Sequence, residues 1–376
     1  MRSIRIHSFS TVIPEWSLLA IAAVLSCLGL LTMNTFGADS LAPRQSVWLL
    51  LGIGVYLVLA HIDMRFLRRP QVILAVYGAI LALLVVLLFA THPVMGARSW
   101  FSLGAISFQP ADFMKVALIA LLAKYFSRRH IEIAHIRHIM VSGFYAAMPM
   151  LLVLLQPDLG TAVILGSIWF GMVLVSGIPK KQVVVILALG CAAAAALWFG
   201  GLHEYQRARV VAFVNPAADI RGSGYNAYQA TIAVGSGEWF GKGIGYGTQS
   251  KLRFLPQYET DFIFAAYAEE WGFVGVLFVI SLYGLLLMRL ITIARRSAIN
   301  FDSLFTIGVA IMLLTHIVIH AGINVGLLPV TGTTIPFMSS GGSHLIMEFA
   351  ALGVVASLAR YGHSAPRDMA EQEYFN

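Results

Sequence analysis

Long hydrophobic segments, separated by shorter polar ones, run through the whole chain. A helix that crosses the hydrocarbon core of a membrane needs about 20 apolar residues, and ten segments approach or exceed this length. They cover residues 16–33, 46–62, 72–90, 111–126, 139–155, 161–178, 182–201, 262–289, 304–328 and 343–359. The pattern predicts an all-α polytopic membrane protein with ten transmembrane helices in a single domain over residues 1–376. The segment 111–126 is the weakest, because Asp112 and Lys115 lie in its first turns.

One long polar segment, residues 202–260, separates the seventh and eighth hydrophobic segments. Its stretch from Tyr225 to Val234 is rich in Tyr, Gln, Ala and Ile, and we expect it to form a short helix at the membrane interface. The glycine-rich run 235–247 follows it. Because glycine tolerates backbone conformations that other residues avoid, this run predicts tight turns where the backbone approaches another element closely.

Basic residues indicate which side of the membrane each connection occupies, because Lys and Arg are retained on the cytoplasmic side of short loops. With the amino terminus inside, 16 of the 25 Lys and Arg residues fall in cytoplasmic segments. The short outer loops then hold only Arg44 and Arg98. An even number of spans places both termini in the cytoplasm, and the loop 202–260 becomes extracytoplasmic.

The composition supports a membrane location and excludes nucleic-acid binding. Hydrophobic residues make up 59% of the chain and charged residues 11%, against about 25% charged residues in soluble domains. The net charge of +7 is explained by the basic cytoplasmic segments rather than by a nucleic-acid partner. Cys27 and Cys191 lie inside apolar segments without a C-x-x-C spacing, so we expect two buried thiols and no disulfide. No small-residue cleavage site follows the first segment, which indicates a retained anchor.

Six charged residues are predicted at one depth, at the outer ends of helices or one turn inside. Charged groups within a span are costly and usually line a cavity or a pathway. The alternative for each is a side chain that extends to the interface. The six are Arg44, Arg98, Asp112, Lys115, Asp158 and Asp261.

The three cations of this set suit a diphosphate ligand. Arginine presents a planar fork to phosphate oxygens, and lysine presents a point charge. Glycines 241–247 offer backbone N–H groups to an anion, but they lack the Lys-Ser/Thr of a Walker loop and favour turns. The three cations are Arg44, Arg98 and Lys115.

Asp261 opens the eighth segment, where Asp is also a good helix cap. Because it lies between the charged loop and an apolar helix, we interpret it as a candidate general base. Glu269 and Glu270, about two turns further on, are expected to form bonds within the bundle. His316 and His320, and likewise His344 and Glu348, have metal-compatible spacing, but packing or interhelical hydrogen bonds are favoured.

Nine short motifs lie at the helix ends and in the loops between about Arg44 and Gly342. They are Gly96-Ala97-Arg98-Ser99-Trp100-Phe101, Phe108-Gln109-Pro110-Ala111-Asp112-Phe113-Met114-Lys115, Gln156-Pro157-Asp158-Leu159-Gly160-Thr161-Ala162, Gly241-Lys242-Gly243, Gly247-Thr248-Gln249, Phe254-Leu255-Pro256, Thr260-Asp261-Phe262-Ile263-Phe264-Ala265, Ala268-Glu269-Glu270-Trp271-Gly272-Phe273 and Gly326-Leu327-Leu328-Pro329-Val330-Thr331-Gly332. Together they resemble the SEDS family of shape, elongation, division and sporulation proteins. The similarity to elongation members exceeds that to division members.

The resemblance implies a peptidoglycan glycosyltransferase that polymerises lipid II for cell elongation and shape, beside a class B penicillin-binding protein. It implies Asp261 as the essential acid. Substrate-binding positions follow the same motifs, namely Arg98, Trp100, Lys115, Asp158, Lys242, Thr248 and Gln249, with Arg44 added for its charge. A divalent cation such as Mg²⁺ is a possible cofactor, with Asp112 as a weak candidate ligand.

The chain departs from the family pattern at several positions, and two other functions stay open. Asp112 stands where Glu is usual, and His316, His320, Gln257, Thr334 and Ser340 also differ from the family's usual residues. The first alternative is a lipid II flippase, which would need polar groups on both sides of the midplane. The second is a non-catalytic scaffold of the wall-synthesis complex, which would need neither Asp261 nor the cations.

Overall fold

Helices account for almost all of the regular structure in the computed structural model, which describes residues 13–34, 41–90, 99–103, 106–127, 136–215, 223–252, 254–255 and 257–362. The long helices are α1 (Ile13–Asn34), α2 (Leu41–His61), α3 (Pro70–Ala90), α4 (Pro110–Ser127), α5 (Ile136–Leu155), α6 (Leu159–Val175), α7 (Lys180–Ala196), α11 (Ile263–Arg296), α12 (Asn300–Asn324) and α13 (Gly342–Gly362). The shorter elements are η2 (Met64–Arg68), β1 (Phe101–Leu103), β2 (Ile106–Phe108), η3 (Leu197–Gly201), α8 (Glu204–Val214), α9 (Ser223–Ser236) and α10 (Thr248–Lys251).

Eight of the described helices are long and apolar enough to cross a membrane, which confirms an all-α polytopic membrane protein. The remaining two long helices are α6, an apolar helix of 17 residues, and α4, which carries Asp112, Lys115 and Lys124. Most of α4 is buried among other helices. A helix in the middle of a bundle can carry charged residues because protein, and not lipid, surrounds them. The total of ten spans stays a prediction.

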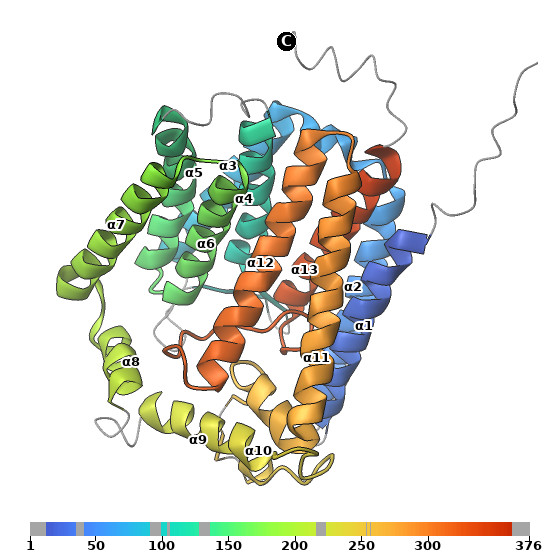
Figure 1. Cartoon of the computed structure of the whole chain (residues 1–376), viewed down its shortest axis with the longest axis vertical. Helices are drawn as coiled ribbons and strands as arrows, with labels where there is room; N and C mark the ends of the chain where they lie inside the picture. Colours follow the sequence, from blue (N-terminus) through green and yellow to red (C-terminus); the bar gives the residue numbers. More distant parts are fainter. Residues whose placement is uncertain are drawn as a thin grey trace, which may run out of the picture.

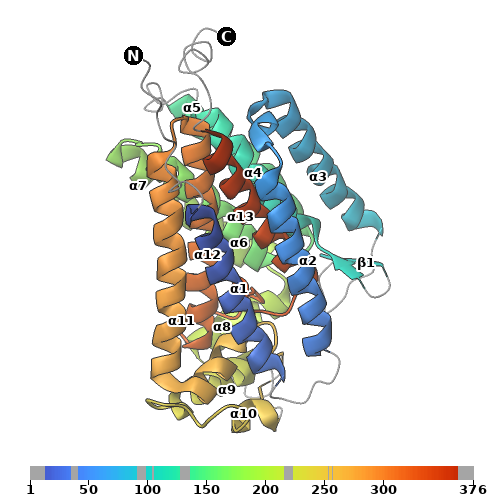
Figure 2. The same ribbon diagram turned by 90° about the vertical axis from the view of Figure 1, so that its right-hand side faces the viewer.

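The connections divide between the two ends of the bundle. Helix α1 begins and α13 ends at the same end, together with η2 and the α6–α7 and α11–α12 connections (Figures 1 and 2). At that end Arg68 of η2 forms a salt bridge of 2.6 Å with Asp302 of α12. Helices α8, α9 and α10 lie at the other end, where α11 begins. The basic connections and the long loop therefore lie at opposite ends of the bundle.

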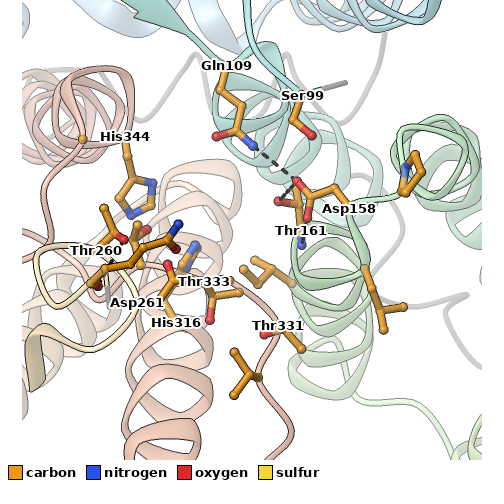
Figure 3. A pocket seen from close by; sticks show the side chains of 18 of the residues that line it. Ser99, Gln109, Asp158, Thr161, Thr260, Asp261, His316, Thr331, Thr333 and His344 are labelled. Carbon is orange, nitrogen blue, oxygen red and sulfur yellow. Dashed lines mark hydrogen bonds between the residues drawn. The ribbon is translucent and has the colours of Figure 1, made fainter. Parts of the chain in front are cut away.

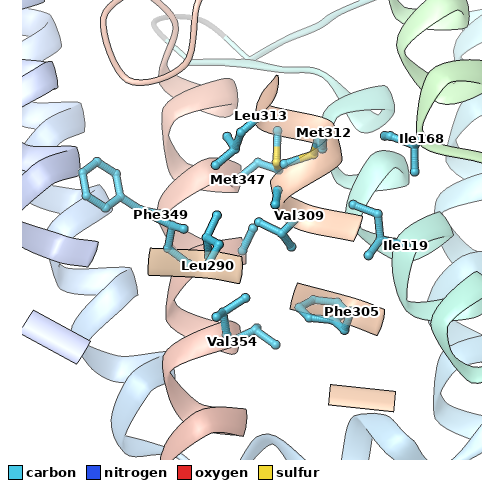
Figure 4. Packing of buried hydrophobic residues seen from close by; sticks show 14 of the residues in the cluster. Ile119, Ile168, Leu290, Phe305, Val309, Met312, Leu313, Met347, Phe349 and Val354 are labelled. Carbon is cyan, nitrogen blue, oxygen red and sulfur yellow. The ribbon is translucent and has the colours of Figure 1, made fainter. Parts of the chain in front are cut away.

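A continuous apolar core fills the bundle around the turns of α12 that precede His316. Phe305, Val309, Met312 and Leu313 of α12 have at most 1% of their surface exposed. Side chains of α4, α6, α11 and α13 surround them (Figure 4). Close packing of this kind leaves few voids larger than a water molecule.

The glycine-rich run packs against a break in α11, as its composition predicted. At Gly272 the backbone takes φ 65° and ψ −166°, which interrupts the helix. The loop fills the break through backbone hydrogen bonds, from Lys242 N to Glu269 O at 3.0 Å and from Phe273 N to Glu238 O at 2.8 Å. A Cβ on Gly272 would lie 2.3 Å from Gly241 N, so only glycine permits this approach.

Four features differ from the sequence-based expectations. Strands β1 and β2 pair antiparallel before α4, and α8 is a helix that the periodicity did not predict. Helix α11 ends at Arg296, seven residues beyond the predicted end at 289, because the helix continues past the hydrophobic segment into its basic last turn. Cys27 and Cys191 are exposed on the bundle surface rather than buried, because apolar residues of a membrane helix face lipid as well as the core.

Candidate active site

A cavity of roughly 390 Å³ lies at the end of the bundle that carries α8. Its wall is formed by the start of α4, the start of α6, one face of α8, the middle of α12, the start of α13 and the loops 257–261 and 329–334. Figure 3 shows side chains from these elements turned toward one another. Of the predicted site residues, Trp100, Lys115, Asp158, Asp261 and the metal candidate Asp112 line this cavity.

Asp261 lies in the turn before α11 and does not cap the helix. The cap position is Phe262, without a side-chain capping bond, which rules out the simple structural explanation for Asp261. The turn is held by Gln257 O, which accepts from Asp261 N at 3.2 Å, and by Asn324 Nδ2, which donates to Asp261 O at 3.0 Å. Backbone bonds therefore place the residue, and its carboxylate faces the cavity.

Burial raises the pKa of the Asp261 carboxyl to about 6, because desolvation disfavours the charged form. A hydrogen bond from Thr260 and the positive charge of Arg209 oppose this rise. The carboxyl is therefore ionised near neutral pH and still basic enough to take up a proton.

Arg209 of α8 is a cavity cation that the sequence reasoning missed, because it was counted only as one charge of the long loop. A Cβ placed on Gly332, which has φ 72°, would lie 3.7 Å from Asp261 Oδ2 and 4.0 Å from Arg209 Nη1. Both side chains therefore flank Gly332. Tyr205, one turn earlier, donates from its hydroxyl to Pro157 O at 2.9 Å and fixes α8 to the cavity rim. The i, i+4 spacing of Tyr205 and Arg209 places both on one face of a helix, and this spacing was the sequence signal that could have identified Arg209.

Asp158 lies across the cavity from Asp261 (Figure 3) and caps α6. Its carboxylate accepts from Thr161 N at 3.0 Å, from Thr161 Oγ1 at 2.8 Å and from Gln109 Nε2 at 3.3 Å. Burial raises its pKa, and the bonds from Thr161 act in the opposite direction. Two of these bonds hold the first turn of α6, and the bond from Gln109 joins it to the start of α4.

Lys115 is almost completely buried at 2% exposure, yet its ammonium reaches the cavity wall. Its Nζ lies 2.8 Å from Asp112 Oδ1 and 3.1 Å from His316 Nε2. Trp100, which is 37% exposed, provides an aromatic surface on the same wall. The cavity thus combines a cation, a carboxylate of raised pKa and an aromatic ring.

The two predicted arginines are not placed in the cavity. Arg98 lies outside the described residues. Arg44 is exposed on the first turn of α2 and is not among the residues that line the cavity. Its neighbour Gln45 donates to Ser339 O at 3.3 Å and accepts from Gly341 N at 3.2 Å. The first turn of α2 therefore holds the rim near Ser340.

Lys242, Thr248 and Gln249 gather around Glu269 and not around the cavity. Glu269 Oε1 accepts from Lys242 Nζ at 2.7 Å, from Thr248 Oγ1 at 3.1 Å and from Gln249 N at 3.1 Å. Glu270 Oε1 accepts from Gly245 N. Both glutamates are buried as expected, but their partners come from the glycine-rich loop and the start of α10, and not from another long helix of the bundle. Substrate contact by the three loop residues stays a prediction.

The histidines of α12 and α13 contact polar groups within the bundle, on a loop, on the same helix and on a neighbouring helix. His320 Nδ1 lies 2.8 Å from Thr333 O, and His344 lies between Asp112 on α4 and Glu348 on its own helix. Within the described ranges, no group of three or more His, Cys, Asp or Glu side chains is arranged to hold a metal ion.

The chain matches the family model of FtsW, RodA and SpoVE, described as cell cycle proteins, over residues 7–364. The chain belongs to this family, the SEDS family. The peptidoglycan glycosyltransferase MrdB of Escherichia coli is 35% identical over 342 residues, which cover 91% of this chain and 92% of MrdB. The probable peptidoglycan glycosyltransferase FtsW of Thiomicrospira cyclica is 39% identical over 284 residues, 73% of this chain and 71% of FtsW.

Two solved structures share the fold of this SEDS protein over most of its length. One is a chain from a structure on the coordination of polymerization and crosslinking by a peptidoglycan synthase complex. It is 34% identical to the SEDS protein, with a TM-score of 0.79, and the match covers 93% of this chain and 98% of the chain in the complex. The crystal structure of Thermus thermophilus RodA is 33% identical, with a TM-score of 0.70 and coverage of 93% and 97%. The membrane helices and the bacterial relatives of this SEDS protein identify it as an inner-membrane protein.

Proposed function

We propose that this chain, a peptidoglycan glycosyltransferase of the SEDS family, extends glycan strands from lipid II with Asp261 as the general base. The observation that carries this proposal is the carboxylate of raised pKa that faces a cavity without serving as a helix cap. A general base works best when its pKa lies near the operating pH. The Asp261 carboxyl, with a pKa of about 6, meets this condition.

The proposed reaction is a single inverting displacement. The donor sugar is α-linked to undecaprenyl diphosphate and the product bond is β, so neither a protein nucleophile nor a covalent intermediate is needed. Asp261 takes the proton from the 4-hydroxyl of the acceptor GlcNAc as that oxygen attacks the anomeric carbon. The bond to the diphosphate breaks, and the electron pair leaves with the diphosphate.

Cations in the cavity wall stabilise the charge that develops on the leaving diphosphate. Lys115 is the central one, because its ammonium lies at the cavity wall beside Asp112. Arg209 adds a second positive charge beside Asp261. Arg98 and Arg44 belong to the same proposal through the sequence. A divalent ion would reach this site mainly through the diphosphate oxygens, because Asp112 is already paired with Lys115.

The packing of the bundle favours polymerisation over lipid II flipping. A flippase needs a polar path on both sides of the midplane. Beyond His316, the next turns of α12 contribute Val309, Met312 and Leu313 to a buried apolar core (Figure 4). A scaffold, in turn, would have no need for a buried lysine at the wall of a cavity.

The partner and the orientation complete the proposal. The sequence contains no Ser-x-x-Lys transpeptidase motif, so a separate enzyme must crosslink the product. A class B penicillin-binding protein supplies this activity, consistent with the synthase complex that the fold resembles. The basic connections lie in the cytoplasm and the cavity faces the cell exterior. The similarity to both MrdB and RodA supports a role in elongation and cell shape.

Purified protein, with and without a class B penicillin-binding protein, should convert lipid II into glycan polymer that is resolved by gel electrophoresis. A parallel assay in sealed vesicles should show no transfer of fluorescent lipid II between leaflets. Transfer without polymer would support the flippase alternative. A protein that does neither, alone or with its partner, would support the scaffold.

A further inference from the structure

His316 and His344 lie on either side of the Asp112–Lys115 ion pair, and the reaction proposed above does not use them. Their rings are 5.2 Å apart between centroids, and both line the cavity. His316 comes from α12, His344 from α13 and the ion pair from α4. Three helices therefore meet at this cluster.

The hydrogen bonds of His316 identify which ring nitrogen carries the hydrogen. Its Nδ1 lies 2.8 Å from Met312 O, a carbonyl that can only accept, so Nδ1 is the donor. Its Nε2 lies 3.1 Å from Lys115 Nζ, which can only donate. Nε2 must therefore be the unprotonated nitrogen, and His316 is a neutral acceptor for the lysine.

A neutral acceptor holds Lys115 without cancelling its charge. Two of the three N–H groups of the ammonium are directed by Asp112 Oδ1 and His316 Nε2, which come from different helices. Since the ammonium is tetrahedral, fixing two N–H directions also fixes the third. Within the described part of the chain no residue takes that third N–H, and it is available to a ligand in the cavity.

Asp112 is held in turn from α13. His344 Nδ1 lies 3.3 Å from Asp112 Oδ1, and His344 Nε2 lies 2.8 Å from Glu348 Oε1. The other oxygen of Glu348 accepts from Phe337 N at 2.8 Å. These contacts keep the Asp112 carboxylate in place, so Asp112 cannot draw Lys115 out of the cavity wall.

We propose that His316 is a positioning residue that directs the Lys115 ammonium at the leaving diphosphate, with His344 and Glu348 bracing Asp112. This inference rests on the proposed function. Without the acceptor at 316, Lys115 would turn toward Asp112 alone and lose its fixed direction. The effect on the reaction would then pass through Lys115.

The first test compares His316→Leu, which removes the acceptor, with His316→Gln, whose amide oxygen retains one. We expect the rate of lipid II polymerisation to fall roughly 10- to 100-fold in the Leu variant, the range for losing a hydrogen bond to a charged group. The Gln variant should keep most of the wild-type polymerisation rate. His316→Met fills the space with a flexible apolar chain and replaces the Leu variant if that protein does not fold.

The matched control is His138→Leu. His138 is also buried and also bonds α4, through its Nδ1 and the Tyr125 hydroxyl at 3.0 Å, but it does not line the cavity. The His138→Leu variant should lose thermal stability without a change in its inhibition by undecaprenyl diphosphate. In His316→Leu the inhibition constant of this leaving group should rise about tenfold, which a smaller folded fraction cannot produce.

A double-mutant cycle with Lys115→Met decides whether His316 acts through Lys115. We expect His316→Leu to have no further effect once Lys115 is replaced. Additive losses, or a His316→Leu protein with wild-type rate and inhibition, would overturn the positioning role. Failure of wild-type protein to polymerise lipid II would instead refute the proposed function, so the two outcomes are distinguishable.

Discussion

Replacing Asp261 by asparagine removes the proposed proton acceptor while it keeps the size of the side chain. The turn around this residue should survive, because it is held through the backbone N–H and C=O of Asp261 by Gln257 and Asn324. Without a base, polymerisation of lipid II should fall by roughly 10²- to 10⁴-fold. The structure therefore predicts an inactive protein that folds normally.

The raised pKa also predicts the direction of the stability change. A carboxyl whose pKa is higher in the folded state favours the protonated folded form, so its contribution is fully present below about pH 4 and is lost as pH rises through about 6. The difference corresponds to at most about 3 kcal/mol at pH 7.5, and solvent in the cavity reduces it. Since asparagine carries no charge at any pH, Asp261→Asn should be as stable as wild type near pH 4 and more stable at pH 7.5.

The assay combines polymer yield with thermal unfolding in detergent across pH 4 to 8. Wild-type kcat/KM should decrease as pH falls through about 6, because the base becomes protonated. Asp63→Asn serves as a control, since Asp63 is an acid that pairs with Arg65 in the η2 connection, at the end of the bundle opposite the cavity. Wild-type polymer yield from Asp261→Asn would refute the general-base assignment. Loss of both fold and activity would show that the carboxylate is structural.

Three further predictions concern orientation, the loop and the partner. After replacement of Cys27 and Cys191, a thiol introduced by Arg65→Cys should resist a membrane-impermeant thiol reagent in spheroplasts, whereas one introduced by Tyr246→Cys should react. Labelling at position 65 would show that the orientation is the opposite one. Glu269→Gln should destabilise the glycine-rich loop by roughly 1–3 kcal/mol, because Lys242 and Gln249 N lose a charged acceptor; proteolysis no faster than wild type would contradict this. A single-span penicillin-binding protein should co-purify with the chain from the native host. If repeated purification yields the chain alone with full activity, the partner is unnecessary for catalysis.

The sequence was sufficient for features that depend on local pattern. Hydrophobic length predicted the membrane helices, and glycine content predicted that the run 235–247 would approach another backbone closely, as it does at Gly272. Motifs identified Asp261, Asp158 and Lys115 as residues of one site, and all three line one cavity. Each of these inferences uses chemistry carried by neighbouring residues or by a quoted motif.

Only the tertiary structure decided which polar side chains share a cavity and which bond to one another. Arg209 joins Asp261 because α8 folds back over the cavity rim, and His316 meets Lys115 although 201 positions separate them. Lys242, Thr248 and Gln249 lie around Glu269 because the loop fills the break in α11. Sequence spacing determines which residues share a face of one helix, but contacts between helices depend on how the helices pack, and no local pattern specifies that packing.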